Sequence, residues 1–481
     1  MSDHPLLGKT MQAFLVMLAI FAGPYCSPRL ERYRVARAPW EKERSVTEVT
    51  SVATTPTALA TGETSLKASG NEATVSNALP TAPEPPPPPV EIDPKIVPVE
   101  DPTGHMMDAF YEKLAQTERK EPGAVTRVLH YGDSVITSDY ISGTMRRRMQ
   151  ARYGDAGHGF ILVANPWEWY FHNDVLHFAT EGWNANRITG PLTKDGAYGL
   201  GGVTFHGAPG ASATFGTAER GEVGKRVGRF DVYYMEQPDG GNVEVRIGKG
   251  EPEKLSTRGD AKASRVRSFP VEDGEAKMVL RSLGGGDVRL FGVALERDVP
   301  GVTYDALGAN GARIRLWEAM DADHWADQMA LRKPALVVLQ FGTNESEDGW
   351  FNAEVYEKSV RVVLSNVKRA APDASILMAA PLDRAEKGDD GRLRSKKVIL
   401  KLIASQRMVA TELGVAYWDT WKAMGGEGAM GRWVNANPQL GAGDLTHPTP
   451  AGAQVIGEHL DKALAQGLAV WKARPRGDAG R

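Results

Sequence analysis

The sequence predicts an α/β fold with a parallel sheet, interrupted by an inserted all-β module. The first observation is a set of short apolar runs, rich in β-branched or aromatic residues, that end in Gly, Asp or Asn: residues 124–133, 301–311, 334–345, 374–383 and 414–421. Helical patterns separate the later runs, and this alternation is typical of parallel strands joined by crossover helices. The second observation is a long stretch in which that rhythm stops and Gly-rich turns separate short alternating runs.

The N-terminal residues predict a targeting segment followed by a spacer. Residues 10–28 carry no charged side chain, and the apolar run at 14–23 has the length of a signal-peptide core. We expect residues 1–28 to be a signal peptide or membrane anchor, and the protein to be exported to the periplasm or cell surface. Residues 29–101 are rich in Thr, Ala, Ser, Glu and Pro, a composition that predicts a disordered linker.

The rest of the chain divides into two α/β parts around the insertion. Residues 102–164 hold helical patterns at 106–119 and 138–154 on either side of the first strand, which ends at Asp133. Residues 165–300 contain short alternating runs without a long helix, as expected of a β-sandwich or jelly roll. Residues 301–472 return to strand and helix, with helical patterns at 351–370, 392–414 and 450–471, and residues 473–481 form a disordered tail.

Composition excludes several classes of function. The 481 residues carry a formal net charge of -3, and nothing in that balance indicates the concentrated basic face of a nucleic-acid-binding protein. Cys26 is the one cysteine, so the chain forms no internal disulfide. His158, His172, His177 and His206 show no convincing spacing for metal ligands. We therefore expect no metal and no cofactor.

Polar residues with complementary chemistry gather at the predicted strand ends. Gly132, Asp133 and Ser134 end the first strand, and Asn344 follows the third. Asp444 and His447 lie near the C-terminus, just before a helix that Thr449 can cap and Pro450 can open. A serine hydroxyl becomes a nucleophile when a histidine takes its proton, and that histidine needs a carboxylate on its other nitrogen. Asp444 and His447 can supply this pair from one loop.

An oxyanion hole can form from the same strand ends. The backbone N–H of Ser134, a glycine N–H from residues 308–311 and the side-chain amide of Asn344 are neutral or main-chain donors, as developing negative charge requires. Each residue also has an ordinary structural interpretation: Ser134 as a helix cap, Asn344 as a turn former and His447 as a helix-start residue. The occurrence of all of them at strand ends, in order, favours catalysis. Ser138 or Asp139 is then the better candidate for capping the helix that follows.

This arrangement resembles the SGNH (GDSL-type) hydrolase superfamily. The Gly-Asp-Ser block matches at residues 132–134, the Gly-x-Asn block at 342–344 and the D-x-x-H block at 444–447, although Val135 stands where the motif name has Leu. The resemblance covers residues 103–164 and 301–470 and implies a flavodoxin-like, three-layer domain. It also implies Ser134, Asp444 and His447 as catalytic residues, and Ser134, Asn344 and a glycine as oxyanion donors. Gly311 is favoured, with Gly308 as the alternative.

The insertion and the first block are similar to those of bacterial peptidoglycan O-acetylesterases, which carry a carbohydrate-binding-like β module there. We therefore expect an exported serine esterase that removes O-acetyl groups from a cell-wall or extracellular polysaccharide. Two alternatives are an O-acetyltransferase with the same triad and a non-catalytic polysaccharide-binding protein. Trp167, Trp169 and Tyr170, at the start of the module, are candidates for stacking on sugar rings, although such aromatics more often belong to a core between domains.

Overall fold

The computed structural model describes residues 92–475, which lie in one compact unit. The expected targeting segment at 1–28, with Cys26, and most of the expected linker lie outside the described residues. Within residues 92–475, no helix is long and apolar enough to cross a membrane.

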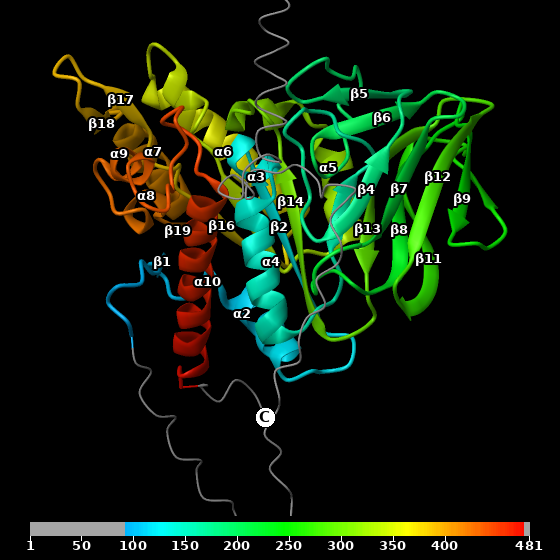
Figure 1. Ribbon diagram of the computed structural model, residues 1–481, viewed down its shortest axis with the longest axis horizontal. Helices are drawn as coiled ribbons and strands as arrows, with labels where there is room; N and C mark the ends of the chain where they lie inside the picture. The colour runs from blue at the N-terminus through cyan, green and yellow to red at the C-terminus, as the bar shows by residue number, and fades with distance from the viewer. Residues whose placement is uncertain (1–91, 476–481) are drawn as a thin grey trace, which may run out of the picture. The chain divides into compact units, whose positions relative to one another are not determined.

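One sheet of six strands organises the α/β part (Figure 1). Its spatial order is β1 (Val99–Glu100), β19 (Ala416–Trp418), β16 (Ser375–Ala379), β15 (Leu336–Gln340), β2 (Val125–Gly132) and β14 (Gly301–Gly308). All neighbours pair in parallel except β1, which runs antiparallel to β19. In chain order the parallel strands follow the 2-1-3-4-5 arrangement of flavodoxin-like domains. The predicted α/β class is therefore confirmed.

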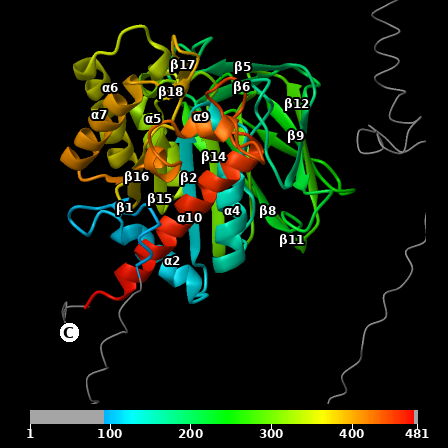
Figure 2. The ribbon, with the colours of Figure 1, turned by 60° about the vertical axis from the view of Figure 1, so that its left-hand side comes forward.

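Helices cover both faces of this sheet. Because side chains alternate along a strand, Val128, Leu336 and Val338 join one buried cluster, whereas Leu129 and Leu339 join the other. The first cluster includes residues of α2 (Asp108–Glu118), α4 (Tyr140–Tyr153) and α10 (Pro450–Lys472), and Figure 2 shows α10 crossing in front of the sheet beside α4. The second includes residues of α5 (Ala322–Arg332), α6 (Ala353–Ala370) and α7 (Val398–Glu412). Strands buried on both sides explain the continuous apolar runs in the sequence.

The inserted module consists of two antiparallel sheets. One contains β5 (Trp183–Arg187), β6 (Val203–Gly207), β8 (Val227–Glu236), β11 (Ala263–Gly274) and β13 (Arg289–Glu296), with β3 (Gly159–Leu162) paired to β13. The other contains β4 (Val175–Ala179), β7 (Ser212–Thr217), β9 (Asn242–Ile247), β10 (Glu253–Ser256) and β12 (Lys277–Gly284). Apolar residues of both sheets share one buried cluster with the α5–α7 face of the parallel sheet. The module is thus continuous with the α/β core.

Short elements complete the described part of the chain: α3 (Ser134–Thr137), η2 (Ile314–Ala319), η3 (Glu345–Glu347), β17 (Ala385–Lys387), β18 (Leu393–Ser395), α8 (Thr420–Ala423) and α9 (Ala429–Val434). Several of them lie in loops that follow strands of the parallel sheet.

The structure differs from the expected boundaries at two places. Val99 and Glu100, expected in the linker, pair with Trp418 and Tyr417 as an edge strand. A two-residue strand beside a Pro-rich stretch has no periodicity from which to recognise it. In addition, the module's pairing begins at β3, before the expected boundary at 165, because Gly159–Leu162 pair with β13 rather than with the parallel sheet.

A buried ion-pair network ties the module to the α/β part. Arg332, at the end of α5, donates to both Asp305 oxygens at 2.6 and 2.8 Å and pairs with Glu296 of the module strand β13. Glu296 also accepts from Arg127 and Arg229, each at 2.7 Å. Arg332, Asp305 and Glu296 are almost completely buried. The surrounding arginines hold the pKa of Glu296 well below its usual value despite the opposing effect of burial.

Candidate active site

Three neighbouring strands of the parallel sheet end in one row. Gly132 at the end of β2 pairs in register with Gly308 of β14 on one side and Gln340 of β15 on the other. The loops that follow carry Ser134, Gly311 and Asn344. Carboxyl ends of parallel strands share one edge of the sheet, so these residues are brought together by topology.

Ser134 begins the short helix α3, and Asp133 caps that helix. Asp133 Oδ1 accepts a hydrogen bond from Val135 N at 3.2 Å, and its Oδ2 accepts from Thr343 N at 3.3 Å. Burial raises the pKa of Asp133, while these hydrogen bonds oppose the rise. Asp133 therefore links the segment of Ser134 to the segment of Asn344 and positions both.

The N-cap position of the next helix, α4, has no side-chain cap. Asp139 stands at the N-cap of α4 in a left-handed conformation, with a φ of 53°, but its side chain does not cap the helix. Its carboxylate instead accepts from Ser142 Oγ and, through both oxygens, from the buried guanidinium of Arg146. The need to neutralise a buried Arg146 takes Asp139 away from the capping role.

Ser134, His447 and Asp444 form a continuous hydrogen-bonded chain. Ser134 Oγ lies 2.7 Å from His447 Nε2, and His447 Nδ1 lies 2.6 Å from Asp444 Oδ2. A carboxylate accepts only, so Nδ1–H donates to Asp444 and Nε2 is left to accept the Ser134 hydroxyl proton. Thr449 caps α10 by accepting from Gly452 N, and Pro450 opens it, as the sequence predicts. The site thus brings together the three residues expected to be catalytic.

The loop geometry holds Asp444 against His447. Leu445 adopts a left-handed φ of 60°, which bends the chain back so that Asp444 Oδ1 accepts from the backbone N of both Thr446 and His447 at 3.0 Å. Partial burial opposes ionisation of Asp444, but the hydrogen bonds from His447 and from these backbone groups outweigh it and lower its pKa. The side chains of His447 and Asp444 remain 40% and 51% exposed, so water reaches the pair.

Asn344 and Gly311 flank this chain as potential oxyanion donors. Asn344 Nδ2 donates to Ala312 O at 2.9 Å, which uses one of its two N–H groups and ties the amide to the Gly311 loop. Gly311 is exposed, has a φ of 74° and faces open space, whereas a Cβ at Gly308 would lie 2.3 Å from Thr137 N. Gly308 therefore serves the close packing of α3 on β14, whereas Gly311 has no such packing role and stays the favoured candidate for the donor.

If Asn344 stabilises a developing oxyanion, Asn344→Ala is expected to lower kcat for p-nitrophenyl acetate by about 10²–10³-fold, with a smaller effect on KM. Steady-state kinetics measures this directly. The matched control is Asn435→Ala, because Asn435 Nδ2 also donates to a main-chain carbonyl, that of Gly431, but on α9. Similar kcat values for the Asn344→Ala variant and the control would contradict the assignment of Asn344 to the oxyanion hole.

The aromatic residues at the module junction divide into core and surface. Tyr170 is buried, and its hydroxyl accepts from Leu162 N at 2.9 Å. Trp167 packs against the core, whereas Trp169 is 62% exposed. Exposed Phe171 contacts Trp169 edge-on, and its backbone N donates to Thr137 O of α3. Of the expected sugar-stacking residues, only Trp169 is largely exposed, and its partner Phe171 was not among those predicted.

Two of the four histidines considered as metal ligands, His158 and His172, form a pair close to Tyr170. His158 Nε2 lies 3.0 Å from His172 Nδ1, and both approach Asp139, which makes these residues the one three-ligand cluster found within residues 92–475. Arg146, however, already occupies both Asp139 oxygens. Burial lowers the pKa of His172 to about 3 and that of His158 well below its usual value. The cluster is accounted for as neutral histidines packed beside an ion pair.

The site has the geometry that a serine acylhydrolase requires, on a flavodoxin-like α/β sheet. Residues 274–455 match the model of the GDSL-like Lipase/Acylhydrolase family, so this part of the chain is similar to that family. The match starts within the module, at the end of β11, and includes Gly311, Asn344, Asp444 and His447, while Ser134 lies before it.

One solved structure shows the same fold over most of its length. A peptidoglycan O-acetylesterase superimposes with a TM-score of 0.62 and 22% identity, covering 75% of this chain and 96% of its own. A family two carbohydrate esterase from Cellvibrio japonicus is 13% identical over 61% of this chain and 98% of its own, with a TM-score of 0.25. No curated protein matches the sequence of this chain.

Proposed function

We propose that the protein is an exported serine esterase that removes O-linked acetyl groups from a cell-wall or extracellular polysaccharide. The observation that carries the proposal is the hydrogen-bonded chain from Ser134 through His447 to Asp444. Similarity in fold to a peptidoglycan O-acetylesterase supports the choice of an acetylated glycan. Trp169 and Phe171, exposed beside the helix of Ser134, add aromatic surface suited to sugar rings.

In this mechanism, His447 Nε2 takes the Ser134 proton as Oγ attacks the ester carbonyl. The backbone N–H groups of Ser134 and Gly311 and the amide of Asn344 stabilise the tetrahedral oxyanion. The bond between the carbonyl carbon and the sugar oxygen then breaks, and His447 gives its proton to that oxygen, so the sugar leaves as a free hydroxyl and an acetyl group remains on Ser134. Water activated by His447 releases acetate and restores the serine. Asp444 keeps the imidazole in the required tautomer and stabilises its charged form.

The exposure of His447 and Asp444 favours water as the acceptor over a sugar hydroxyl. An acetyltransferase must exclude water from its acyl-enzyme, and these two side chains are 40% and 51% exposed. A solely binding role leaves unexplained why Ser134 Oγ and Asp444 both contact the ring nitrogens of His447.

Purified protein is expected to release acetate from O-acetylated peptidoglycan, measured enzymatically against time. The same polymer after alkaline removal of its esters serves as the control and yields none. Acetylated xylan, assayed in parallel, reports on the choice of glycan. Hydrolysis of p-nitrophenyl acetate without acetate release from any polymer would contradict the glycan esterase proposal while leaving the serine chemistry intact.

A further inference from the structure

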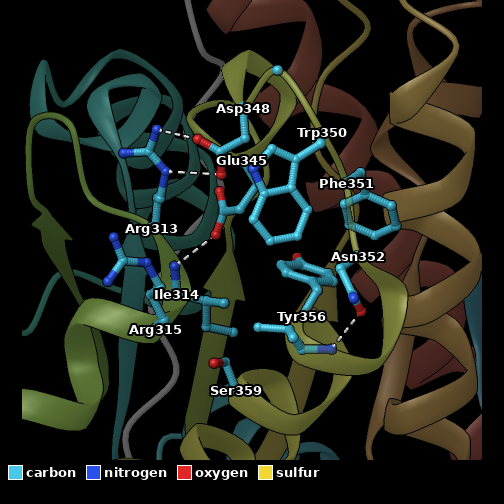
Figure 3. Close-up of a pocket in the computed structure, with 12 residues that line it drawn as sticks. Arg313, Ile314, Arg315, Glu345, Asp348, Trp350, Phe351, Asn352, Tyr356 and Ser359 are labelled. Carbon is cyan, nitrogen blue, oxygen red and sulfur yellow. Dashed lines mark hydrogen bonds and ion pairs between the residues drawn. The ribbon is translucent and has the colours of Figure 1, made fainter.

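A pocket with a volume of about 370 Å³ lies beside the two oxyanion segments (Figure 3). Arg313 follows the Gly311–Ala312 turn and lines one side, while Glu345 follows Asn344 and lines another. Consecutive Cα atoms are about 3.8 Å apart, so the pocket begins within one or two residues of the proposed oxyanion donors. Neither Ser134 nor His447 lines it. It is thus a separate pocket beside the segments that carry Gly311 and Asn344.

Glu345 offers an unused polar group at this pocket. Its side chain is buried, and one oxygen accepts from Ile314 N at 2.7 Å, but Oε2 has no hydrogen-bond partner within residues 92–475. A buried polar atom without a partner costs about 1–3 kcal/mol, so such atoms in native proteins call for an explanation. Burial raises the pKa of Glu345 to about 7, which lets its carboxyl present either an acceptor or a proton. Because Glu345 lines the pocket, a polar ligand bound there would supply the missing partner.

An exposed aromatic ring stands at the same pocket. Trp350 is 73% exposed, the highest value among the large hydrophobic side chains of the described residues. Figure 3 shows its indole between Glu345 and Phe351, above the ring of Tyr356. Arg313 donates to Asp348 at 2.7 Å and so fixes the loop that presents the indole, while Arg315 remains exposed. A flat apolar face beside polar groups matches a pyranose ring, which has C–H faces and a hydroxyl rim.

We propose that this pocket is the subsite for the sugar residue that bears the scissile acetyl group. The pyranose ring stacks on Trp350, and a hydroxyl or amide N–H of the sugar donates to Glu345 Oε2. Arg315 supplies further donors at the rim. This proposal rests on the proposed esterase function and deepens it, because it specifies where the alcohol part of the ester is recognised.

The test compares two substrates, acetylated muropeptides and p-nitrophenyl acetate, which lacks a sugar. Trp350→Ala is expected to raise KM for the muropeptides by about tenfold more than for p-nitrophenyl acetate, equivalent to about 1.4 kcal/mol of selective binding. Trp350→Phe, which keeps an aromatic face, is expected to restore most of this selectivity. Met408→Ala, an exposed position on α7, is the control that leaves both activities unchanged.

A second measurement separates failure of the subsite from failure of the esterase proposal. Deacetylated muropeptides are expected to inhibit p-nitrophenyl acetate hydrolysis by the wild type, with an inhibition constant at least about tenfold higher for Trp350→Ala. The subsite proposal would be overturned if deacetylated muropeptides inhibited the wild type and Trp350→Ala equally, or if Trp350→Ala changed KM equally on the two substrates. Either result would count even if acetate is released from glycan. A change in preference between p-nitrophenyl acetate and butyrate would assign the pocket to the acyl group instead. Absence of acetate release by the wild type would count against the esterase proposal alone.

Discussion

Replacing Ser134 with alanine is expected to lower kcat/KM for ester hydrolysis by about 10⁴-fold or more. The hydroxyl whose oxygen lies 2.7 Å from His447 Nε2 is the one nucleophile in this hydrogen-bonded chain, so its removal abolishes acyl-enzyme formation. The oxyanion donors remain and leave some residual catalysis. Steady-state hydrolysis of p-nitrophenyl acetate measures the effect, and KM is expected to change little.

Ser138 provides the matched control, since it lies just after the end of the same short helix. Ser138→Ala is expected to retain activity close to that of the wild type. Thermal unfolding of both variants checks that neither substitution unfolds the protein. A Ser134→Ala variant that is folded and still active within about tenfold of the wild type would exclude the serine mechanism.

Replacing Arg332 with methionine is expected to lower the free energy of unfolding by about 3–5 kcal/mol. Asp305 and Glu296 would then be left buried without their shared guanidinium. Glu296 belongs to the module strand β13 and Asp305 to β14 of the parallel sheet, so the variant weakens the junction between them. Urea unfolding followed by tryptophan fluorescence measures the loss.

The control for this substitution is Arg369→Met, because Arg369 pairs with Asp323 at the surface. Exposed ion pairs contribute about 0–1 kcal/mol, so this variant is expected to unfold close to the wild type. Replacing Arg332, Asp305 and Glu296 together by apolar residues of similar volume is expected to recover much of the loss. If Arg332→Met unfolds like the control, the network does not stabilise the junction.

The elements that the sequence could predict are those with strong periodicity or fixed spacing. The strands ending at Gly132, Gly308 and Gln340 are continuous apolar runs because both faces of the sheet are buried. Asp444 and His447 were recognisable because three residues of separation on a tight turn suits a carboxylate–imidazole pair. Contacts among Ser134, His447 and Asp444 therefore followed from local patterns combined with the order of parallel strands.

Other features depend on contacts between distant residues and left no local pattern. Asp139 occupies a capping position by sequence, yet Arg146 takes its carboxylate, a competition that only tertiary packing decides. Phe171 becomes significant because its backbone bonds to α3. Glu345 and Trp350 read as ordinary loop residues until the structure shows a buried unpaired oxygen and an exposed indole at one pocket. Contacts of this kind between distant residues produce no periodic pattern in the sequence.

Trapping the acyl-enzyme tests the serine mechanism most directly. Wild-type protein mixed with p-nitrophenyl acetate and quenched in acid within the first turnover is digested and examined by mass spectrometry. The serine mechanism predicts one added acetyl group on the peptide that contains Ser134, and its loss on longer incubation as water completes the cycle. Ester hydrolysis without acetylation of that peptide, or with the acetyl group on another residue, would contradict it.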